Sequence, residues 1–222
     1  MADPPESAPR RALVPEAALR AAAAYAGDPW TPENPYFAQA EPVMARLWEE
    51  LIRPFLHGCD FACVLDLATG HGRNAAMLLP LARRLILVDI QPGNIAICRR
   101  RFGDDPRIAY IVNSGYDLRE VPSGRVTLLY CFDAMVHFDS DVVRAYLAEA
   151  RRVLAPGGRA FLHHSNYQGG HDWRAAPHSR AFMSQALMAH YARKEGLSVL
   201  RQQVMDWGGE PGLDCLSLLE RG

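Results

Sequence analysis

Residues 64–75 read VLDLATGHGRNA, and this stretch decides the fold. It begins as a short apolar run, passes through two glycines and continues into a helical pattern from Arg73. A strand that leads through a glycine turn into a helix exposes bare N–H groups and the positive end of a helix dipole. Glycine suits the turn because, without a Cβ atom, it lets a ligand approach the backbone closely. The stretch therefore predicts a ligand-binding turn at the edge of a sheet.

The charge of that ligand is indicated by Asp66, four residues before Gly70. A carboxylate beside the turn repels a pyrophosphate, but it suits a ligand with an ammonium or sulfonium charge. Residues 70–75 also satisfy the G-x-G-x-x-A pattern of dinucleotide-binding turns, so an NAD-dependent dehydrogenase is an alternative. The position of Asp66 makes this the weaker alternative.

Composition and charge limit the classes of function. The chain has 222 residues, of which 49% are hydrophobic and 22% charged, as is usual for soluble globular proteins. A net charge of −1 gives no basic field, so we do not expect a nucleic-acid partner. No apolar run is long enough to span a membrane, and no signal-peptide core is present. Five scattered cysteines without a C-x-x-C pair indicate a reducing compartment. We expect a cytoplasmic protein without membrane contact.

The N-terminal part differs in pattern from the rest of the chain. Residues 1–15 are rich in proline, alanine and charge, which predicts disorder. Helices are expected at residues 16–26 and 36–56. We therefore divide the chain into residues 1–57, a flexible segment with a helical extension, and residues 58–222, the catalytic domain. The extension is either a lid over a ligand or an outer layer.

After residue 58, strand patterns alternate with helix patterns. Strands are expected at residues 61–67, 85–89, 108–112, 126–132, 159–163, 198–207 and 213–220, and helices at 73–81, 92–102, 139–154 and 179–194. Near-continuous apolar strands alternating with helices predict an α/β fold with a doubly wound, mainly parallel sheet of seven strands. The connection at residues 208–212 is too short for a crossover helix, so the last two strands should form an antiparallel hairpin.

Polar residues end the first four strands: Asp66, Asp89, Asn113 and Asp133. In an open parallel sheet, ligands bind outside these carboxyl ends, where the strand order reverses. Asp89 follows the glycine turn at a distance typical of an acid that binds ribose. A carboxylate suits this role because it accepts two hydrogen bonds from a vicinal diol.

Asp66-x-x-x-Gly70-x-Gly72, Asp89 and residues 156–158 (Pro-Gly-Gly), taken in this order, resemble class I S-adenosylmethionine-dependent methyltransferases of the small-molecule type. The resemblance covers residues 61–222. It implies a Rossmann-like methyltransferase fold that binds S-adenosylmethionine and releases S-adenosylhomocysteine. The family commonly has an acidic residue after the third strand, whereas this chain has Asn113. The implied cofactor contacts are Asp66, Ala68, Gly70, Gly72, Asn74, Asp89, Ile90, Asn113, Ser114 and Phe132.

Methyl transfer needs a base only when the acceptor must lose a proton. The candidates for catalysis are His137, His164 and Asp133. His137 has an alternative role as a structural hydrogen-bonding group. His163 and His164 end the fifth strand and should point to opposite faces, so we expect one of them, His164, to reach the acceptor. The alternative is a hydrogen-bonded pair that shapes the following loop.

The acceptor is expected to contact residues after the fifth strand: His163, Asn166, Asp172, Trp173 and Arg174. The histidines and acids in this region fit no zinc-ligand spacing, so we expect no metal. The histidine-rich strand end favours O-methylation of a sugar or another secondary metabolite. N-methylation of a small amine and a catalytically inactive regulatory partner are the alternatives. A homodimer is compatible with this interpretation.

Overall fold

The computed structural model of the chain describes residues 14–169 and 179–222. In this part of the chain seven strands form one sheet with the order β3-β2-β1-β4-β5-β7-β6. The strands are β1 Val64–Leu67, β2 Leu85–Asp89, β3 Ile108–Val112, β4 Val126–Cys131, β5 Leu154–Ser165, β6 Leu197–Trp207 and β7 Glu210–Arg221. Strands β1 to β5 are parallel, and β7 runs antiparallel to both β5 and β6. The predicted α/β fold and its terminal hairpin are confirmed.

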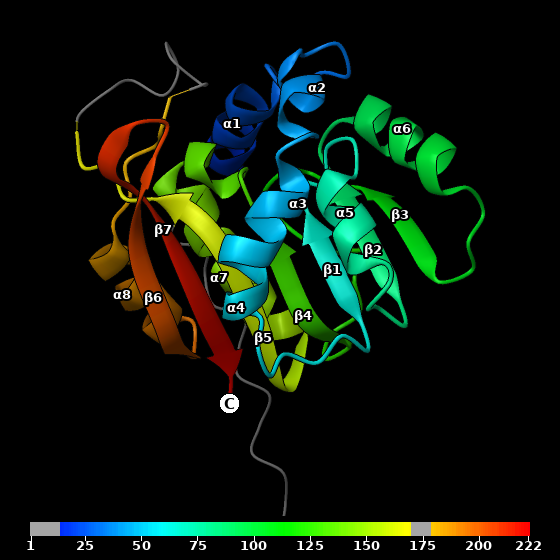
Figure 1. Cartoon of the computed structure of the whole chain (residues 1–222). Helices are drawn as coiled ribbons and strands as arrows, with labels where there is room; N and C mark the ends of the chain where they lie inside the picture. Colours follow the sequence, from blue (N-terminus) through cyan, green and yellow to red (C-terminus); the bar gives the residue numbers. More distant parts are fainter. Residues whose placement is uncertain (1–13, 170–178) are drawn as a thin grey trace, which may run out of the picture.

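Helices cover both faces of the sheet (Figure 1). They are α1 Glu16–Gly27, α2 Tyr36–Ala40, α3 Met44–Leu47, the π-helix Trp48–Ile52, α4 Arg53–Phe55, α5 Arg73–Leu78, α6 Pro92–Phe102, the 3-10 helix Met135–His137, α7 Ser140–Val153 and α8 Gln185–Lys194. Side chains of α3 to α6 form one core with the sheet, and those of α1, α7 and α8 form the other. This arrangement buries the strands on both sides, as their near-continuous apolar sequences require.

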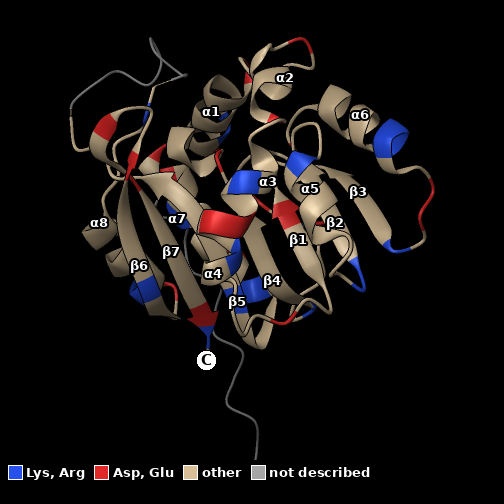
Figure 2. Cartoon of the chain, viewed as in Figure 1, with Lys and Arg blue, Asp and Glu red and all other residues tan. Residues whose placement is uncertain are grey.

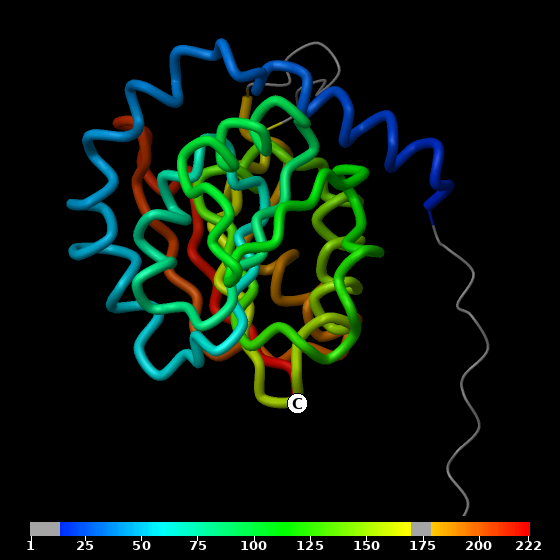
Figure 3. Tube along the Cα trace, turned by 90° about the vertical axis from the view of Figure 1, so that its right-hand side faces the viewer, coloured from blue at the N-terminus to red at the C-terminus, as the bar shows by residue number. Residues whose placement is uncertain are grey.

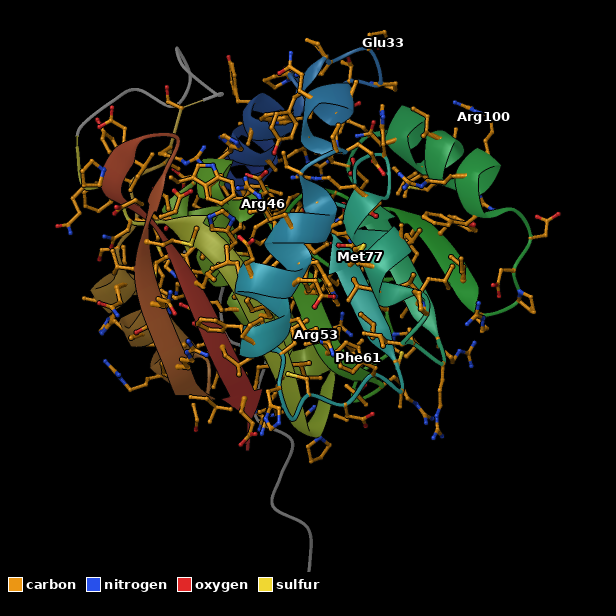
Figure 4. The ribbon with its side chains drawn as sticks, in the orientation of Figure 1. Glu33, Arg46, Arg53, Phe61, Met77 and Arg100 are labelled. Atoms are coloured by element: carbon orange, nitrogen blue, oxygen red, sulfur yellow. The ribbon has the colours of Figure 1, made fainter. Side chains whose placement is uncertain are left out.

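The stretch from α3 to α4 shows why one of its sides packs on the sheet. Trp48 and Ile52 are buried in the core, whereas Arg46 and Arg53, labelled in Figure 4, are exposed. The predicted single helix at residues 36–56 is wrong in its continuity. Pro42 lies between α2 and α3, and the N–H of Arg53 bonds to the carbonyl of Trp48, five residues earlier. A wider π turn therefore interrupts the α-helix.

The predicted helix at residues 179–194 begins later than expected. Helix α8 starts at Gln185, where the Ser184 side chain accepts a hydrogen bond from the N–H of Leu187 and caps the first turn. Before it, the N–H of Ala181 bonds to Val136 and that of Met183 bonds to Tyr167. These bonds to other segments replace the bonds that the first turn of a longer helix would need.

The sheet closes with a two-residue turn between β6 and β7. Trp207 pairs with Glu210, and Gly208 and Gly209 between them have φ values of 60° and 89°. Positive φ at both central positions is the geometry that suits a tight hairpin, and glycine adopts it without steric cost. The long β7 strand thereby reaches β5, where Asp214 pairs with Ser165.

The N-terminal segment lies over the carboxyl ends of the parallel strands. In Figure 3 the blue trace runs across the top of the molecule and then descends along one face. Strands β2 and β4 flank β1 on its two sides, so the strand order reverses beneath this segment. Figure 2 shows Lys and Arg positions mixed with Asp and Glu positions across the described chain. No helix within residues 14–169 or 179–222 is long and apolar enough to cross a membrane.

Candidate cofactor and acceptor site

A cavity lies where the strand order reverses, between the strand ends and the N-terminal segment. It encloses about 880 Å³ of space between atoms, part of which opens to solvent. The floor comes from the ends of β1, β2 and β4, and the roof comes from the N-terminal segment. The roof residues are Ala23, Ala26, Gly27, Trp30, Tyr36, Phe37 and Glu41.

Most of the predicted cofactor residues meet at this cavity. Its walls include Ala68, Gly70, Asn74, Asp89, Ile90, Asn113 and Phe132. Three predicted contacts, Asp66, Gly72 and Ser114, do not line it. All the predicted contacts lie near the strand ends because of their positions in the sequence. The orientation of each residue decides whether it lines the cavity.

Gly70 lets the Phe37 ring pack directly on the glycine turn. Its φ is 55°, and a Cβ atom added there would come within 2.6 Å of the Phe37 ring. Gly72 has a φ of 80°, but a Cβ atom there would meet the ring of Phe102 at 2.6 Å, away from the cavity. Gly72 thereby allows α5 to begin and α6 to pack closely, and its predicted ligand contact stays a prediction.

Asp89 is held rigidly by the turn that it faces. One carboxylate oxygen accepts from the N–H of Gly70 at 2.8 Å, and the other accepts from the N–H of Gln91 at 2.8 Å and from Asn94 Nδ2 at 3.3 Å. Burial raises the pKa of Asp89, while the two backbone hydrogen bonds lower it. Asn94 also lines the cavity, and its Oδ1 atom is buried without a hydrogen-bond partner. An unmatched acceptor beside a fixed carboxylate suits a ligand with hydroxyl groups.

Asp66 does not line the cavity, and its predicted contact with the ligand stays a prediction. Its Oδ2 accepts from the Thr69 hydroxyl at 2.8 Å, and its Oδ1 is buried without a partner. Burial raises the pKa of this carboxyl to about 7. Its charge can influence a cationic ligand only through the turn that it supports.

The loop after β3 presents one of its two predicted residues. Asn113 lines the cavity, and its Nδ2 donates to the Asp117 carbonyl at 2.8 Å and to the Tyr146 hydroxyl at 2.9 Å. The hydroxyl of Ser114 accepts from the N–H groups of Tyr116 and Asp117 and so closes its own turn. The predicted adenine contact of Ser114 stays a prediction.

His164 does not reach the acceptor side, contrary to the expectation. It is fully buried, its Nδ1 donates to the Ser165 carbonyl at 2.8 Å, and its Nε2 contacts the Ser217 hydroxyl at 2.8 Å. Burial lowers its pKa to about 4. His163 lies on the other face, against Phe132 and within hydrogen-bond distance of Asp133. The alternation was predicted, but His164 points to the face of Ala160 and Leu162, on which α7 and α8 pack.

His137 lies beside the roof of the cavity rather than in its wall. Its ring packs against Trp30 with centroids 4.9 Å apart, and its Nδ1 donates to the Ser179 carbonyl at 3.2 Å. Burial lowers its pKa to about 4. These contacts match the structural alternative considered for this residue.

The predicted acceptor residues after β5 are only partly described. Asn166 donates to the Gly212 carbonyl and accepts from the N–H of Gln185, so it joins the hairpin to α8 and does not line the cavity. Asp172, Trp173 and Arg174 lie outside the described residues. Among the residues that are described, no group of three His, Cys, Asp or Glu side chains is placed to hold a metal ion.

Asp133 is the predicted catalytic residue that does line the cavity. Its carboxylate accepts from Arg73 Nη2 at 2.5 Å and from the Tyr36 hydroxyl, to which Arg73 also donates at 2.9 Å. The side chains of Arg73 and Asp133 are only 8% and 6% exposed. The roof is thus joined to the floor by three polar side chains, of which Tyr36 is half-buried.

Sequence reasoning missed Tyr36 and Arg73. Arg73 did carry a signal, because a cation in the first turn of a helix opposes the positive end of the helix dipole. Such a residue calls for a nearby anion, here Asp133. Tyr36 carried no comparable signal, since it is 97 positions from Asp133 in the chain.

Part of the chain is similar to proteins of a known family. Residues 64–158 match the family model described as a methyltransferase domain. Over 102 residues the chain is 30% identical to a protein named Methyltransferase from Claviceps purpurea (strain 20.1), a match that covers 46% of this chain and 31% of that protein. The chain thus spans about a third of the length of this relative.

Two solved structures show the same fold at low sequence identity. An S-adenosylmethionine-dependent methyltransferase from Mesorhizobium loti is 14% identical with a TM-score of 0.63, covering 76% of this chain and 96% of that one. Geranyl diphosphate C-methyltransferase from Streptomyces coelicolor A3(2), solved with Mg²⁺, geranyl diphosphate and S-adenosyl-L-homocysteine, is 15% identical with a TM-score of 0.61, covering 81% and 82%. Residues 64–158 therefore match a methyltransferase domain, and the described chain has the fold of these two methyltransferases.

Proposed function

We propose that the chain transfers the methyl group of S-adenosylmethionine to a hydroxyl group of a small molecule. One observation carries this proposal. A single cavity joins the glycine turn and Asp89 to the carboxylate of Asp133. A donor site and a proton-accepting group therefore face the same enclosed space, as an in-line displacement with loss of a proton requires.

The residues at the floor suit the cofactor. Asp89 and the unmatched Oδ1 of Asn94 can accept from the two ribose hydroxyls. The glycine turn, which lines the cavity at Gly70, suits the amino-acid part, and Ile90 and Asn113 lie at the side where an adenine would pack. When bound, the cofactor supplies a methyl group activated by a sulfonium charge.

Asp133 supports a hydroxyl acceptor. In the structure its carboxylate already accepts a hydrogen bond from the Tyr36 hydroxyl. A hydroxyl group therefore fits the space in front of it. Burial raises the pKa of Asp133, which makes this carboxylate a better proton acceptor. Arg73, in direct contact, favours the charged form that accepts the proton.

The roof supports a small acceptor. The side chains of Trp30, Tyr36 and Phe37 line the cavity from the roof, which suits an acceptor of limited size. A sugar or another secondary metabolite is the acceptor class that we propose. The five unpaired cysteines favour a reducing compartment such as the cytoplasm.

The proposed cofactor can be tested by calorimetric titration with S-adenosylhomocysteine and with NAD. We expect binding of S-adenosylhomocysteine only. Asp89→Ala should weaken it roughly 10- to 100-fold, since hydrogen bonds to a charged group contribute about 1.5–3 kcal/mol each. Asp105→Ala is the control, because Asp105 pairs with Arg107 in the loop between α6 and β3, outside the cavity. Binding of NAD alone, or equal affinity of wild type and Asp89→Ala, would contradict the assignment.

The acceptor can be sought by incubating the protein with S-adenosylmethionine and a panel of hydroxylated and amine-bearing small molecules. Mass spectrometry then detects an added methyl group. Asp133→Asn should retain cofactor binding but lose most of the turnover with a hydroxyl acceptor. A product methylated on nitrogen, with turnover unaffected by Asp133→Asn, would replace O-methylation by the alternative.

A further inference from the structure

We infer that His163 and Asp214 are positioning residues that aim the Asp133 carboxylate into the cavity. The inference rests on the proposed function, because it assigns the acceptor side to Asp133. It adds residues from β5 and β7 that lie behind the cavity and do not line it.

The first observation is the backbone of Asp133. Its φ is 61°, one of only two positive φ values among the described residues other than glycine. This conformation is unfavourable for a residue with a Cβ atom and persists only where the surroundings hold it. It directs the side chain toward Arg73 and Tyr36 at the cavity. The structure must therefore supply contacts that hold this turn.

The second observation is the hydrogen bond that holds it. The N–H of Asp133 lies 3.1 Å from Nδ1 of His163. A backbone N–H can only donate, so Nδ1 must carry a lone pair and the ring proton must lie on Nε2. His163 is fully buried, and burial lowers its pKa, which keeps the ring in this neutral form.

The third observation explains how that tautomer is fixed. Nε2 of His163 lies 3.0 Å from Oδ2 of Asp214, which can only accept when ionised. Arg180 donates to both carboxylate oxygens of Asp214 at 2.8 Å, and so keeps Asp214 charged and in place. A carboxylate that sets the tautomer of a histidine is a known way of orienting the ring. The sequence of contacts runs from Arg180 through Asp214 and His163 to Asp133.

The neighbouring histidine provides an internal comparison. His164 is as deeply buried as His163, and it also contacts a side chain of β7, Ser217. Its other nitrogen meets the adjacent Ser165 carbonyl and no residue of the cavity wall. If the two histidines served only in packing, disrupting the His163–Asp214 pair and disrupting the His164–Ser217 pair would lower turnover equally. If His163 and Asp214 position Asp133, the loss of turnover should be limited to changes in these two residues.

Two substitutions of His163 separate its contact with the Asp133 N–H from its contact with Asp214. In His163→Asn the amide oxygen can replace Nδ1 as the acceptor for the Asp133 N–H. In His163→Gln the longer side chain can reach Asp214 but leaves that N–H without a partner. Both variants lose the ring, so both should unfold at similarly lowered temperatures. Ser217→Ala is the control for a polar change on the same strand.

We expect His163→Gln to lower kcat roughly a hundredfold, the loss that a small misplacement of a reacting group can cause. His163→Asn should retain most of kcat, and the KM for S-adenosylmethionine should stay unchanged in both. Ser217→Ala should keep the wild-type kcat. Equal losses in His163→Asn and His163→Gln, or an equal loss in Ser217→Ala, would show a structural role and overturn the inference.

A nuclear magnetic resonance measurement tests the positioning contact without turnover. In ¹⁵N-labelled protein, a scalar coupling across the N–H···N bond should join the Asp133 amide to Nδ1 of His163. It should be absent in His163→Gln. If the coupling is present but S-adenosylhomocysteine does not bind, the proposed function fails while the contact stands. If the cofactor binds and the coupling is absent in the wild type, the inference itself is wrong.

Discussion

At the scale of single residues, the acids at the strand ends have different environments. Asp89 and Asp133 both reach the cavity, and each has charged or backbone donors around it. Asp66 is buried with one oxygen unmatched. The sequence predicted that these acids lie at one edge, because parallel strands end together. It could not predict their separate roles, since a rotation of one side chain decides which of them meets the ligand.

The burial of Asp66 predicts how the free energy of unfolding depends on pH. Its pKa is raised by burial from 3.8 to about 7, so the folded protein holds the proton to higher pH than the unfolded chain does. The contribution of Asp66 therefore becomes less favourable as pH rises from about 4 to about 7. Asp66→Asn stays neutral and can keep the bond from the Thr69 hydroxyl.

We expect the free energy of unfolding of Asp66→Asn, relative to wild type, to increase by up to about 3 kcal/mol between pH 5 and pH 8. Urea unfolding of both proteins at the two pH values measures this difference. Comparison within each pH cancels the opposite trend of the buried histidines, whose pKa values are lowered. A difference that does not change with pH would mean that Asp66 is ionised normally.

At the scale of elements, helix α2 links the roof to the glycine turn. The Phe37 ring stacks on the His71 ring with centroids 3.9 Å apart, and it lies against Gly70. The helical pattern of this segment was predicted, but its position was left open between a lid and an outer layer. Contacts between α2 and the turn span more than 30 residues, and no local pattern encodes them. Their position above the cavity supports the lid.

If α2 is a lid over the cavity, Phe37→Ala should change the rate at which the ligand dissociates. Removing this ring uncovers the glycine turn, so S-adenosylhomocysteine should dissociate faster, by roughly tenfold for about 1.4 kcal/mol of lost apolar contact. Stopped-flow displacement of bound S-adenosylhomocysteine measures the rate. Val43→Ala serves as the control, because Val43 lies in the same segment but is 39% exposed and outside the cavity wall. Equal dissociation rates in wild type and Phe37→Ala would remove α2 from the entry path.

At the scale of the whole molecule, the sheet was predictable and the site only in part. Alternating strands and helices, the glycine turn and the short connection before β7 predicted a doubly wound, mainly parallel sheet with a terminal hairpin, because each is a local pattern. The group of Tyr36, Arg73 and Asp133 unites α2, α5 and the end of β4. It exists only after residues 36–133 have folded around the sheet. Likewise, the burial of His164 depends on β7, more than 50 residues later.

The same long-range contacts make the N-terminal segment and the sheet edge one ligand-binding unit. Gln91 donates to the Gly27 carbonyl at 2.9 Å, and Asn94 donates to the Trp30 carbonyl at 3.1 Å, so residues next to Asp89 hold the roof directly. A ligand that fixes Asp89 and Asn94 should stabilise these bonds as well. At a hundredfold excess over its Kd, it adds about 2.7 kcal/mol to the stability of the closed form.

Hydrogen–deuterium exchange with and without S-adenosylhomocysteine tests this coupling. We expect slower exchange at residues 66–72 and 89–94, where the ligand binds, and also across residues 16–40, which the ligand touches only at the roof. The hairpin of β6 and β7, at the far edge of the sheet, is the internal reference and should change least. Protection confined to the two turns, with residues 16–40 unchanged, would show that the roof closes independently of the ligand. Because the bonds from Gln91 and Asn94 join the two parts, we expect them to respond together.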